Sequence, residues 1–471
     1  MEDEQPVASG SVKYHHIEED IITWKHPSHL LQRLLALFFM CIIGFGSYFC
    51  YDNPGALQDN FLKDMNLTTS QFVYLYSWYA WPNVILCIVG GFLIDRVFGL
   101  RLGTIIYALL VVIGQIVFAA GAYFNTLWLM LLGRLIFGTG GESLAVAQNN
   151  YAVLWFKGKE LNMVFGFQLS FARVGSTVNF LVMEPLYKYV KTVYQGPDNV
   201  SMSIVLLIAS LTCVISLVSG LLLAWQDKRA EKLLHRKLPE SGEVVKLTDV
   251  KHFTKSFWLI SFIIVCYYAS IFPFVALGKV FFEKKYNYSP GEANIINGLI
   301  YSLGAFLAPL FGFVIDKTGR NVFWVFISVL GTLVAHMLLT FTFINPYVAM
   351  LTMGTSYSML ASALWPLIAM VVPEYQMGTA YGIAQAVENL GLGTVALLTG
   401  IIVDADGYYM VELFFCFLLT VALLLSAVLW LSDTLDKGEL NMSINQRHEM
   451  ESNKIPQPEQ ENLLKDTTNE D

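Results

Sequence analysis

Long apolar segments alternate with short polar ones along most of the chain. Twelve of these segments have about twenty residues or more, the length that a helix needs to cross the hydrocarbon core of a bilayer. They cover about residues 30–51, 71–95, 102–124, 126–153, 161–183, 202–225, 257–277, 293–315, 322–344, 346–372, 379–403 and 409–431. The pattern predicts an all-α membrane protein with twelve transmembrane helices.

The polar segments divide the chain into five parts. Residues 1–29 form a polar N-terminal tail, and residues 433–471 form a C-terminal tail rich in Asn, Gln and Glu. Residues 227–255 form an internal linker dense in Lys and Arg, with six apolar segments on either side of it. The sequence therefore predicts two six-helix halves, over residues 30–226 and 256–432.

Composition excludes several classes of protein. Only 14% of the residues are charged and 55% are hydrophobic, whereas about a quarter of a soluble domain is charged. The sequence has no basic face suited to nucleic acid. All six cysteines lie inside or at the end of an apolar segment, so neither a disulfide framework nor a metal site is expected. We find no nucleophile–base grouping and no phosphate loop, so we expect neither an enzyme nor a cofactor.

The positive charges predict which side of the membrane each polar segment faces. If both tails are cytosolic, that side carries 21 of the 29 Lys and Arg residues and the opposite side carries six. The remaining two, Arg134 and Arg173, lie within the membrane. Both termini are therefore predicted to be cytosolic.

One short motif occurs in each half. The second apolar segment ends in Gly-Phe-Leu-Ile-Asp-Arg from Gly91, and the eighth ends in Gly-Phe-Val-Ile-Asp-Lys from Gly312, 221 residues later. The fifth and eleventh segments share a pair of glycines nine residues apart, at an offset of 216. Two pseudo-symmetric halves in parallel repeat are typical of transporters that rock about a substrate site near the bilayer midplane.

The repeated motif resembles the signature loop of the major facilitator superfamily, and Gly133-Arg134-x-x-x-Gly138 is similar to the arginine motif in its fourth span. The resemblance implies a conformational latch built from Gly91, Asp95, Arg96, Arg134, Asp316, Lys317 and Arg320. An Asp at a helix end can pair with a cation or face the positive N-terminus of another helix. We expect Asp95 and Asp316 to act in this way, and Arg134 to lie near Asp95.

Four further runs are informative: residues 44–54 (GFGSYFCYDNP), 141–149 (GESLAVAQN), 155–161 (WFKGKEL) and 378–382 (GTAYG). They resemble runs of superfamily members that carry dipeptides across the lysosomal membrane. The resemblance implies a uniporter that exports dipeptides to the cytosol, located in the lysosomal membrane as a multi-pass protein. It also implies a partner, a heavily glycosylated single-span lysosomal membrane protein.

Charged residues inside predicted spans are candidates for a substrate site, because a charge there costs about 3 kcal/mol. A dipeptide is a zwitterion, for which an Arg fork suits the carboxylate and an acidic side chain suits the amine. We predict that Arg173 binds the carboxylate and that Glu388 or Glu142 binds the amine. The offset of 216 relates Arg173 to Asn389, which we place in the same site. The alternative is a buried ion pair between Arg173 and Glu142.

Aromatic side chains are candidates for the pockets that hold the dipeptide side chains, although they also serve for packing in membrane helices. The candidates are Tyr48, Tyr51, Tyr267, Tyr268 and Trp365.

The tails and loops carry signals of location. The run Glu459-Gln-Glu-Asn-Leu463-Leu464 fits the acidic dileucine class of endosomal and lysosomal sorting signals. Three glycosylation sequons lie within a few residues of a span on the predicted luminal side, where we expect little or no glycan, at Asn66, Asn199 and Asn287.

Two other functions fit the same pattern. One is a proton-coupled carrier of sugars or organic anions, with Glu142 and Glu388 as proton sites. The other is a non-transporting receptor or scaffold that signals through its tails.

Overall fold

The computed structural model describes residues 29–158, 160–234, 247–436, 438–447 and 449. Within this part of the chain, twelve helices have at least 21 residues. The first six are α1 (Leu30–Tyr51), α4 (Thr69–Leu93), α5 (Gly99–Tyr123), α6 (Leu127–Phe156), α7 (Leu161–Tyr194) and α8 (Asp198–Leu233). The other six are α9 (Lys255–Tyr286), α10 (Pro290–Thr318), α11 (Asn321–Phe341), α12 (Pro346–Val371), α13 (Met377–Asp406) and α14 (Tyr408–Leu435).

Short elements connect some of these helices. Two short helices follow α1, and a π-helical turn and two 3-10 turns stand before α5, α9 and α13. They are α2 (Asn53–Ala56), α3 (Gln58–Lys63), η1 (Ile94–Phe98), η2 (Leu247–His252) and η3 (Glu374–Gln376). The predicted sorting residues Glu459, Leu463 and Leu464 lie outside the described residues.

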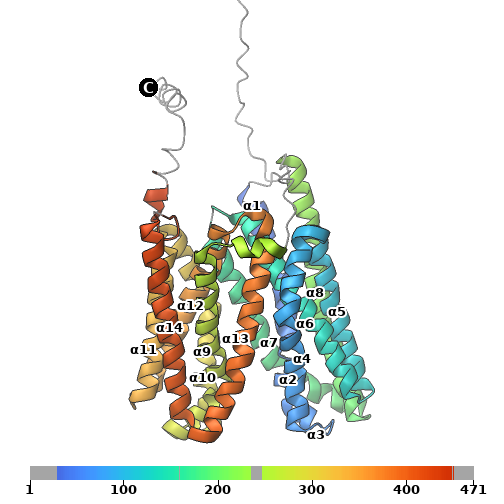
Figure 1. Ribbon diagram of the computed structural model, residues 1–471. Coiled ribbons are helices and arrows are strands. Elements are labelled where there is room, and N and C mark those ends of the chain that lie inside the picture. The colour runs from blue at the N-terminus through green and yellow to red at the C-terminus, as the bar shows by residue number, and fades with distance from the viewer. Residues whose placement is uncertain (1–28, 159, 235–246, 437, 448, 450–471) are drawn as a thin grey trace, which may run out of the picture.

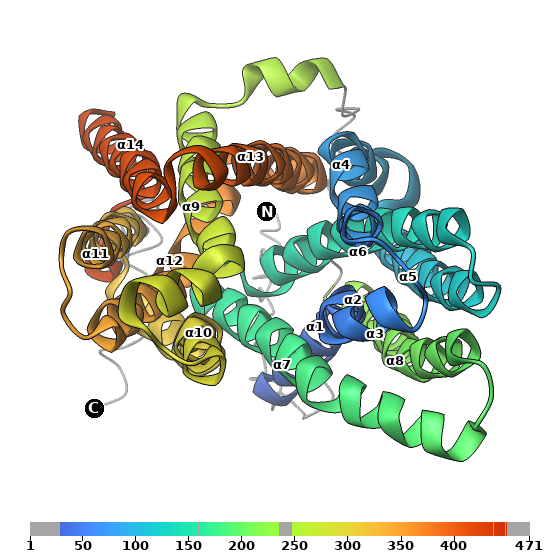
Figure 2. The ribbon, with the colours of Figure 1, turned by 90° about the horizontal axis from the view of Figure 1, so that it is seen from below.

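The helices form two bundles. Figure 2 shows α1 and α4–α8 gathered in one bundle and α9–α14 in the other. The start of α1 and the end of α14 lie at the same end of the molecule, here called the tail end, and α2 and α3 lie at the far end (Figure 1). The predicted fold class is confirmed. Which end faces the cytosol stays a prediction.

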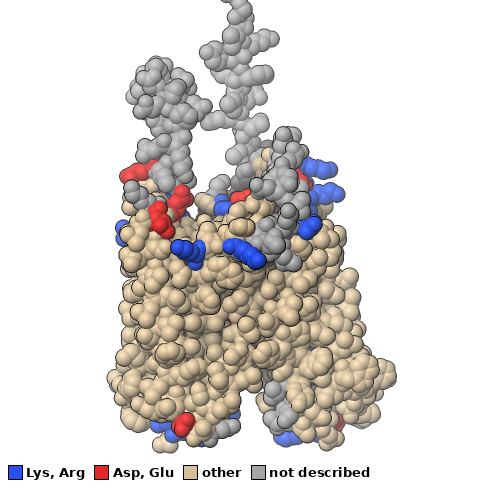
Figure 3. All heavy atoms as spheres, in the orientation of Figure 1, with Lys and Arg blue, Asp and Glu red and all other residues tan. Residues whose placement is uncertain are grey.

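The surface has the character of a membrane protein. Ten segments of the described chain are long and apolar enough to cross a membrane, and one of them covers most of α4 together with α5. The helix α7 is not among the ten, since Gln168, Arg173 and Asn179 lower its hydropathy. Figure 3 shows charged side chains gathered at the two ends, with an uncharged belt between them.

The internal repeat extends to the helix starts. At the start of α4, Thr68 and Gln71 form a capping box, in which each side chain binds the other residue's backbone N–H. At the start of α10, Ser289 and Glu292 do the same, again 221 residues later. Such boxes satisfy backbone donors that a helix start leaves unpaired. The same local chemistry therefore begins the second helix of each half.

One predicted boundary is wrong. The helix α8 continues to Leu233, so it includes Asp227, which we assigned to the linker. Asp227 is only 3% exposed. Its carboxylate accepts hydrogen bonds from Arg101 Nε at 2.6 Å and from Trp155 Nε1 at 3.1 Å. These contacts with α5 and α6 hold the polar end of the helix against the bundle.

Asp95 and Asp316 each bind the N-terminus of a helix in the other half. The carboxylate of Asp95 accepts from Gly378 N at 2.9 Å and from Thr379 N at 2.6 Å, at the start of α13. Asp316 accepts from Asn162 N at 3.1 Å and from Met163 N at 2.8 Å, at the start of α7. This is the geometry predicted for the two motif carboxylates, and it joins the halves at the tail end.

Glycines bring the halves into close contact beside these carboxylates. A Cβ on Gly91 would lie 2.0 Å from the carbonyl oxygen of Gly378, and one on Gly312 would lie 2.5 Å from that of Asn162. Only a residue without a side chain permits such an approach. At the far end the surface is hollowed between the two bundles (Figure 3). The structure is therefore closed at the tail end and open at the far end.

Three other predicted latch residues, Arg96, Lys317 and Arg320, also lie at the tail end. Arg96 lies over the ring of Phe92, 5.7 Å from its centroid, and Lys317 lies 5.6 Å from the ring of Phe313. Arg320 occupies the N-cap position of α11. Their part in a latch stays a prediction.

We predict that Gly91→Ala weakens the closure of the tail end, because its methyl group would overlap the Gly378 carbonyl. The full-length variant should melt several degrees lower, as for a steric cost of about 1–3 kcal/mol. The matched control is Gly220→Ala in α8, where the nearest atom to a new Cβ lies at 3.6 Å. Thermal unfolding in detergent measures both, and equal melting temperatures for the two variants would contradict the prediction.

Candidate functional site

Arg173 lies near the middle of α7, where aromatic rings of the other half surround its guanidinium. Nη2 donates a hydrogen bond to the Tyr357 hydroxyl at 2.5 Å. The guanidinium carbon lies 4.5 Å from the ring centroid of Tyr301, 5.4 Å from that of Phe272 and 5.6 Å from that of Tyr357. These rings come from α9, α10 and α12. Cation–π attraction holds the charge at the contact between the halves.

Among the described residues, the guanidinium of Arg173 has one hydrogen-bond partner. Arg has five N–H donors, and Nε of Arg173 is buried without a partner. No carboxylate of the described residues forms an ion pair with Arg173 within 4.0 Å. Arg173 is half-buried, and a cation withdrawn from water without an anion is costly. The arrangement therefore favours an anionic ligand that completes the site.

Glu142 lies in α6 and binds neutral partners. One carboxylate oxygen accepts from the Tyr79 hydroxyl at 2.7 Å, and the other accepts from Asn389 Nδ2 at 3.3 Å. Asn389 belongs to α13, so this contact also joins the halves. The neighbouring Glu388 is 6% exposed and accepts from Gln385 Nε2 at 3.1 Å.

The buried ion pair that we considered between Arg173 and Glu142 is absent from the structure. Arg173 points to the aromatic rings of the second half, whereas Glu142 is held by Tyr79 and Asn389. The positions along α6 and α7 are compatible with a pair, but the directions of the side chains are not.

Tyr48 connects the cation to the two acids. Its hydroxyl is close enough to Arg173, Glu142 and Glu388 to interact with each of them electrostatically. Tyr48 is 36% exposed although it lies in the membrane-spanning part of α1, as expected for a side chain facing an open space. Glu388 is in turn within electrostatic range of Glu142 and Arg173, so the three charged residues belong to one site.

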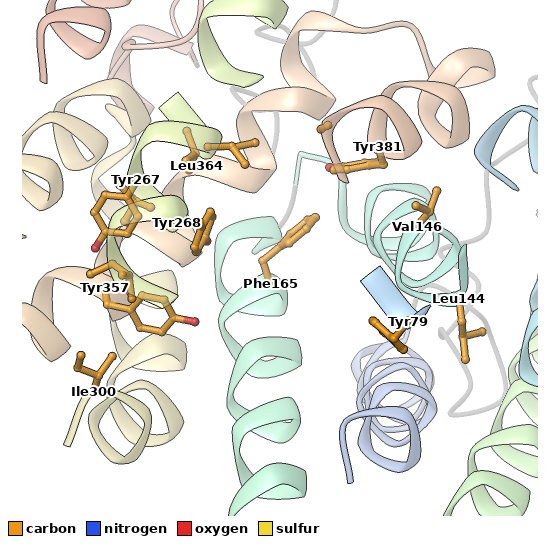
Figure 4. Close-up of a cluster of buried hydrophobic side chains, with 14 of the residues drawn as sticks. Tyr79, Leu144, Val146, Phe165, Tyr267, Tyr268, Ile300, Tyr357, Leu364 and Tyr381 are labelled. Carbon is orange, nitrogen blue, oxygen red and sulfur yellow. The ribbon is translucent and has the colours of Figure 1, made fainter. Parts of the chain in front are cut away.

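An aromatic wall extends from the arginine toward the tail end. Trp365 Nε1 donates to the Tyr268 hydroxyl at 3.1 Å, and the Trp365 ring stacks on Tyr381 at 6.4 Å. The Tyr268 ring stacks on Phe272, which also borders Arg173. Figure 4 shows Tyr268 and Tyr357 directed toward the space beside α7, with Tyr267 directed away from it.

Two predicted aromatic residues lie outside this wall. Tyr267 is fully buried, and its hydroxyl hydrogen-bonds Thr332 of α11 at 2.9 Å. Tyr51 packs edge-on against Tyr79, with ring centroids 4.7 Å apart, and Tyr79 in turn binds Glu142.

The predicted position of Arg134 is wrong. Arg134 lies near the far end, not beside Asp95, because α6 begins at that end and Arg134 is in its second turn. Its guanidinium donates to the carbonyls of Leu75 at 3.0 Å, Cys50 at 3.4 Å and Tyr51 at 3.1 Å. It is 0% exposed. These contacts join α1, α4 and α6 within one half.

Sequence reasoning missed several residues of the site. Tyr301 and Tyr357 surround Arg173, and Asp52 at the end of α1 interacts electrostatically with Arg173. The aromatic content of α10 and α12 gave no signal, because spacing on one helix does not reveal what another helix meets. Asp52 directly follows an apolar span, where a charge is usually read as the end of a helix.

The chain shares its fold and much of its sequence with known proteins. The sequence model of the Major Facilitator Superfamily matches residues 40–395. The lysosomal dipeptide transporter MFSD1 of Danio rerio is 55% identical over 417 residues, covering 88% of this chain and 90% of the relative. The protein of the same name from Homo sapiens is 53% identical, with 90% and 91% covered, and that from Gallus gallus is 48% identical, with the same coverage.

Solved structures agree on the fold. The outward conformation of FucP, a Major Facilitator Superfamily transporter, aligns with a TM-score of 0.65 and covers 84% of this chain and 99% of its own. At 15% sequence identity, this likeness concerns the arrangement of the helices alone.

We predict that substitution by lysine affects the thermal stability differently at the two intramembrane arginines. Arg134→Lys should lower the melting temperature, because one ammonium group cannot reach three carbonyls and each lost charged hydrogen bond costs about 1.5–3 kcal/mol. Arg173→Lys should leave it nearly unchanged, since Arg173 has one hydrogen-bond partner among the described residues. Thermal unfolding of the ligand-free protein measures both, and the opposite ranking would contradict the assignment.

Proposed function

The chain belongs to the Major Facilitator Superfamily, and from this premise we propose that it exports dipeptides from the lysosome to the cytosol by alternating access, as a uniporter. The curated relatives named as lysosomal dipeptide transporters support the substrate and the location. The tail end is then cytosolic and the far end luminal. The observation that carries the proposal is the guanidinium of Arg173, which lies between the halves and has no carboxylate partner within the described part of the chain.

Arg173 binds the carboxylate of the dipeptide. Its spare donors form the planar fork that suits two carboxylate oxygens, and the surrounding rings keep water away from the bond. The Tyr357 hydroxyl, already bonded to Nη2, orients the fork. Hydrogen bonds to charged groups are worth about 1.5–3 kcal/mol each.

Glu142 and Glu388 bind the amine on the opposite side. Glu142 keeps Tyr79 and Asn389 as neutral donors, so its negative charge is available to an ammonium group. Glu388 lies within electrostatic range of both Glu142 and Arg173. Trp365 and Tyr268 border the space where the dipeptide side chains lie. Asn389 of the second half donates to Glu142 of the first, so this hydrogen bond forms only while the two halves are together.

Transport requires the tail end to open. The described state admits substrate from the lumen, since the far end is hollowed and the tail end is joined by Asp95 and Asp316. Both carboxylates bind backbone N–H groups across the contact between the halves, so rocking breaks these bonds without breaking any helix. A substrate that contacts Arg173 of the first half and Asn389 of the second half at the same time favours the change to the state that is open at the tail end.

We predict that proteoliposomes containing the full-length protein take up labelled dipeptides, and that Arg173→Ala lowers the apparent affinity about a hundredfold, as for a loss of about 3 kcal/mol. A dipeptide amide, which lacks the carboxylate, should be a poor substrate of the wild type. The Arg173→Ala variant should no longer distinguish the amide from the free acid. Likewise, Glu142→Gln should no longer distinguish a dipeptide from its N-acetylated form.

The same assay decides between the transport modes. A uniporter equilibrates the dipeptide with or without a pH gradient, and a proton ionophore changes nothing. Accumulation that depends on the gradient favours the proton-coupled alternative, for which the poorly exposed Glu388 is the candidate proton site. Absence of dipeptide uptake by the wild type would overturn the function, whereas full activity of Arg173→Ala would overturn the site alone.

We also propose that a glycosylated single-span membrane protein accompanies this chain. The luminal connections are short, with Gly407 alone between α13 and α14 and residues 342–345 between α11 and α12. A chain with so little luminal structure is exposed to lysosomal proteases unless another protein covers it. The resemblance to partnered transporters supports the same proposal.

We predict that the luminal sequons carry no glycan. The Asn199 side chain donates to the carbonyl of Tyr123 at 2.6 Å, and Asn287 is the C-cap residue of α9. Glycosidase treatment of the protein from cells should leave its electrophoretic mobility unchanged, while a co-purifying partner should shift. A shift of this chain itself would contradict the prediction.

A further inference from the structure

The segment that follows α14 folds back onto the molecule. Asp433, in the last turn of α14, is 7% exposed, and its carboxylate accepts from Leu440 N at 3.1 Å and from Asn441 N at 2.9 Å. Its backbone carbonyl accepts from Gly438 N at 2.8 Å. The Leu440 side chain is 6% exposed and belongs to the core. Residues 438–447, here called the return segment, are thus anchored at one end.

The return segment pairs with the turn between α10 and α11. Gly319 and Ser443 form an antiparallel bridge, and Arg320 N donates to the Met442 carbonyl at 3.0 Å. Gly319 has a φ of 68°, and a Cβ there would lie 2.6 Å from the Met442 oxygen. The turn therefore has a shape that fits the return segment.

Asn441 caps α11 from outside the helix. The N-cap residue Arg320 has a left-handed backbone and its side chain makes no capping hydrogen bond. Helix starts leave backbone N–H groups unpaired, and an Asn or Asp oxygen usually satisfies one of them. Here Asn441 Oδ1 accepts from Phe323 N at 3.0 Å. The capping residue thus comes from a segment more than a hundred positions later in the chain.

The capped turn is part of the contact between the halves. Asp316, which binds the start of α7, lies three residues before Gly319. Asn321, in the first turn of α11, donates to Asn162 Oδ1 of α7 at 2.5 Å. A change in the backbone conformation from Gly319 to Phe323 would therefore move the side chains of Asp316 and Asn321, which bind α7 and hold the tail end closed.

The first half fastens the corresponding turn differently. There the side chain of Arg101 itself forms ion pairs with Asp227 and Glu231 near the end of α8. When Gly99 is aligned with Gly319, Arg101 corresponds to Asn321, which binds α7 instead of α14. In the second half the return segment takes the place of this arginine and connects the turn to Asp433.

We propose that Asn441 is a positioning residue for transport. The return segment caps α11 and holds the α10–α11 turn in the shape that lets Asp316 bind α7, so it stabilises the state closed at the tail end. The cytosolic tail is in this way mechanically coupled to the conformational cycle. The coupling concerns the two states of the protein and does not depend on which substrate it carries.

The test uses the native Cys87 of the full-length protein as a reporter of closure. Cys87 is 0% exposed, and its carbonyl lies against Gly382 across the contact between α4 and α13. Opening of the tail end exposes it to a maleimide, and mass spectrometry identifies the labelled residue. Asn441→Ala should raise the labelling rate about fivefold, the effect of losing a typical helix cap, and should lower dipeptide uptake. Asn441→Asp, which keeps the accepting oxygen, should behave as the wild type.

Matched controls separate this role from general destabilisation. Asn445→Ala removes an exposed asparagine of the same segment and should change nothing. Cys41, Cys50 and Cys213 are buried within the first half and should stay unlabelled, whereas unfolding would expose them together with Cys87. If Asn441→Ala does not accumulate, Gly319→Ala disturbs the same contact from the other side. The proposal would be overturned if Cys87 of Asn441→Ala were labelled at the wild-type rate. It would also be overturned if Asn441→Asp were labelled as fast as Asn441→Ala.

Discussion

The structure depends on two carboxylates that each bind the N-terminus of a helix in the opposite half. Asp95 at α13 and Asp316 at α7 join the bundles at one end while the other end stays open. The partial positive charge of a helix N-terminus attracts the carboxylate, and its free N–H groups give the bond direction. Both contacts lie between rigid bodies, so they can break and reform without loss of secondary structure. This makes them suited to a molecule that alternates between two states.

Two arginines of the membrane region show that burial alone does not identify a functional residue. Arg134 has three carbonyl partners within one half and stabilises that half. Arg173 has one hydroxyl partner and lies against rings of the other half. The two arginines differ in how many of their N–H donors have a hydrogen-bond partner among the described residues. A guanidinium with spare donors at the boundary between two moving bodies can respond to a ligand, whereas a saturated one cannot.

Much of the architecture was predictable because it follows from local patterns. Twelve apolar segments, the repeated motif and the positive charges predicted the helices, the two halves and their common orientation. The site was predictable in part, since a charge inside an apolar span is conspicuous in any sequence. The partners of those charges were not: the alternative Arg173–Glu142 pair is absent from this state, and Arg134 does not lie beside Asp95. A helix of thirty residues places its side chains on all faces, and a rotation of about 100° per residue decides which neighbour each one meets.

The sequence by itself determined the membrane class, the helix count and the residues that carry charge into the bilayer, because these depend on hydropathy and on position along the chain. Tertiary structure alone decided that Tyr301, Tyr357 and Phe272 enclose Arg173, that Asn389 meets Glu142, and that Asn441 caps a helix which begins at Asn321. Each of these contacts joins segments far apart in sequence. They arise from the packing of whole helices, to which many weak contacts contribute together. A short sequence motif does not predict that packing.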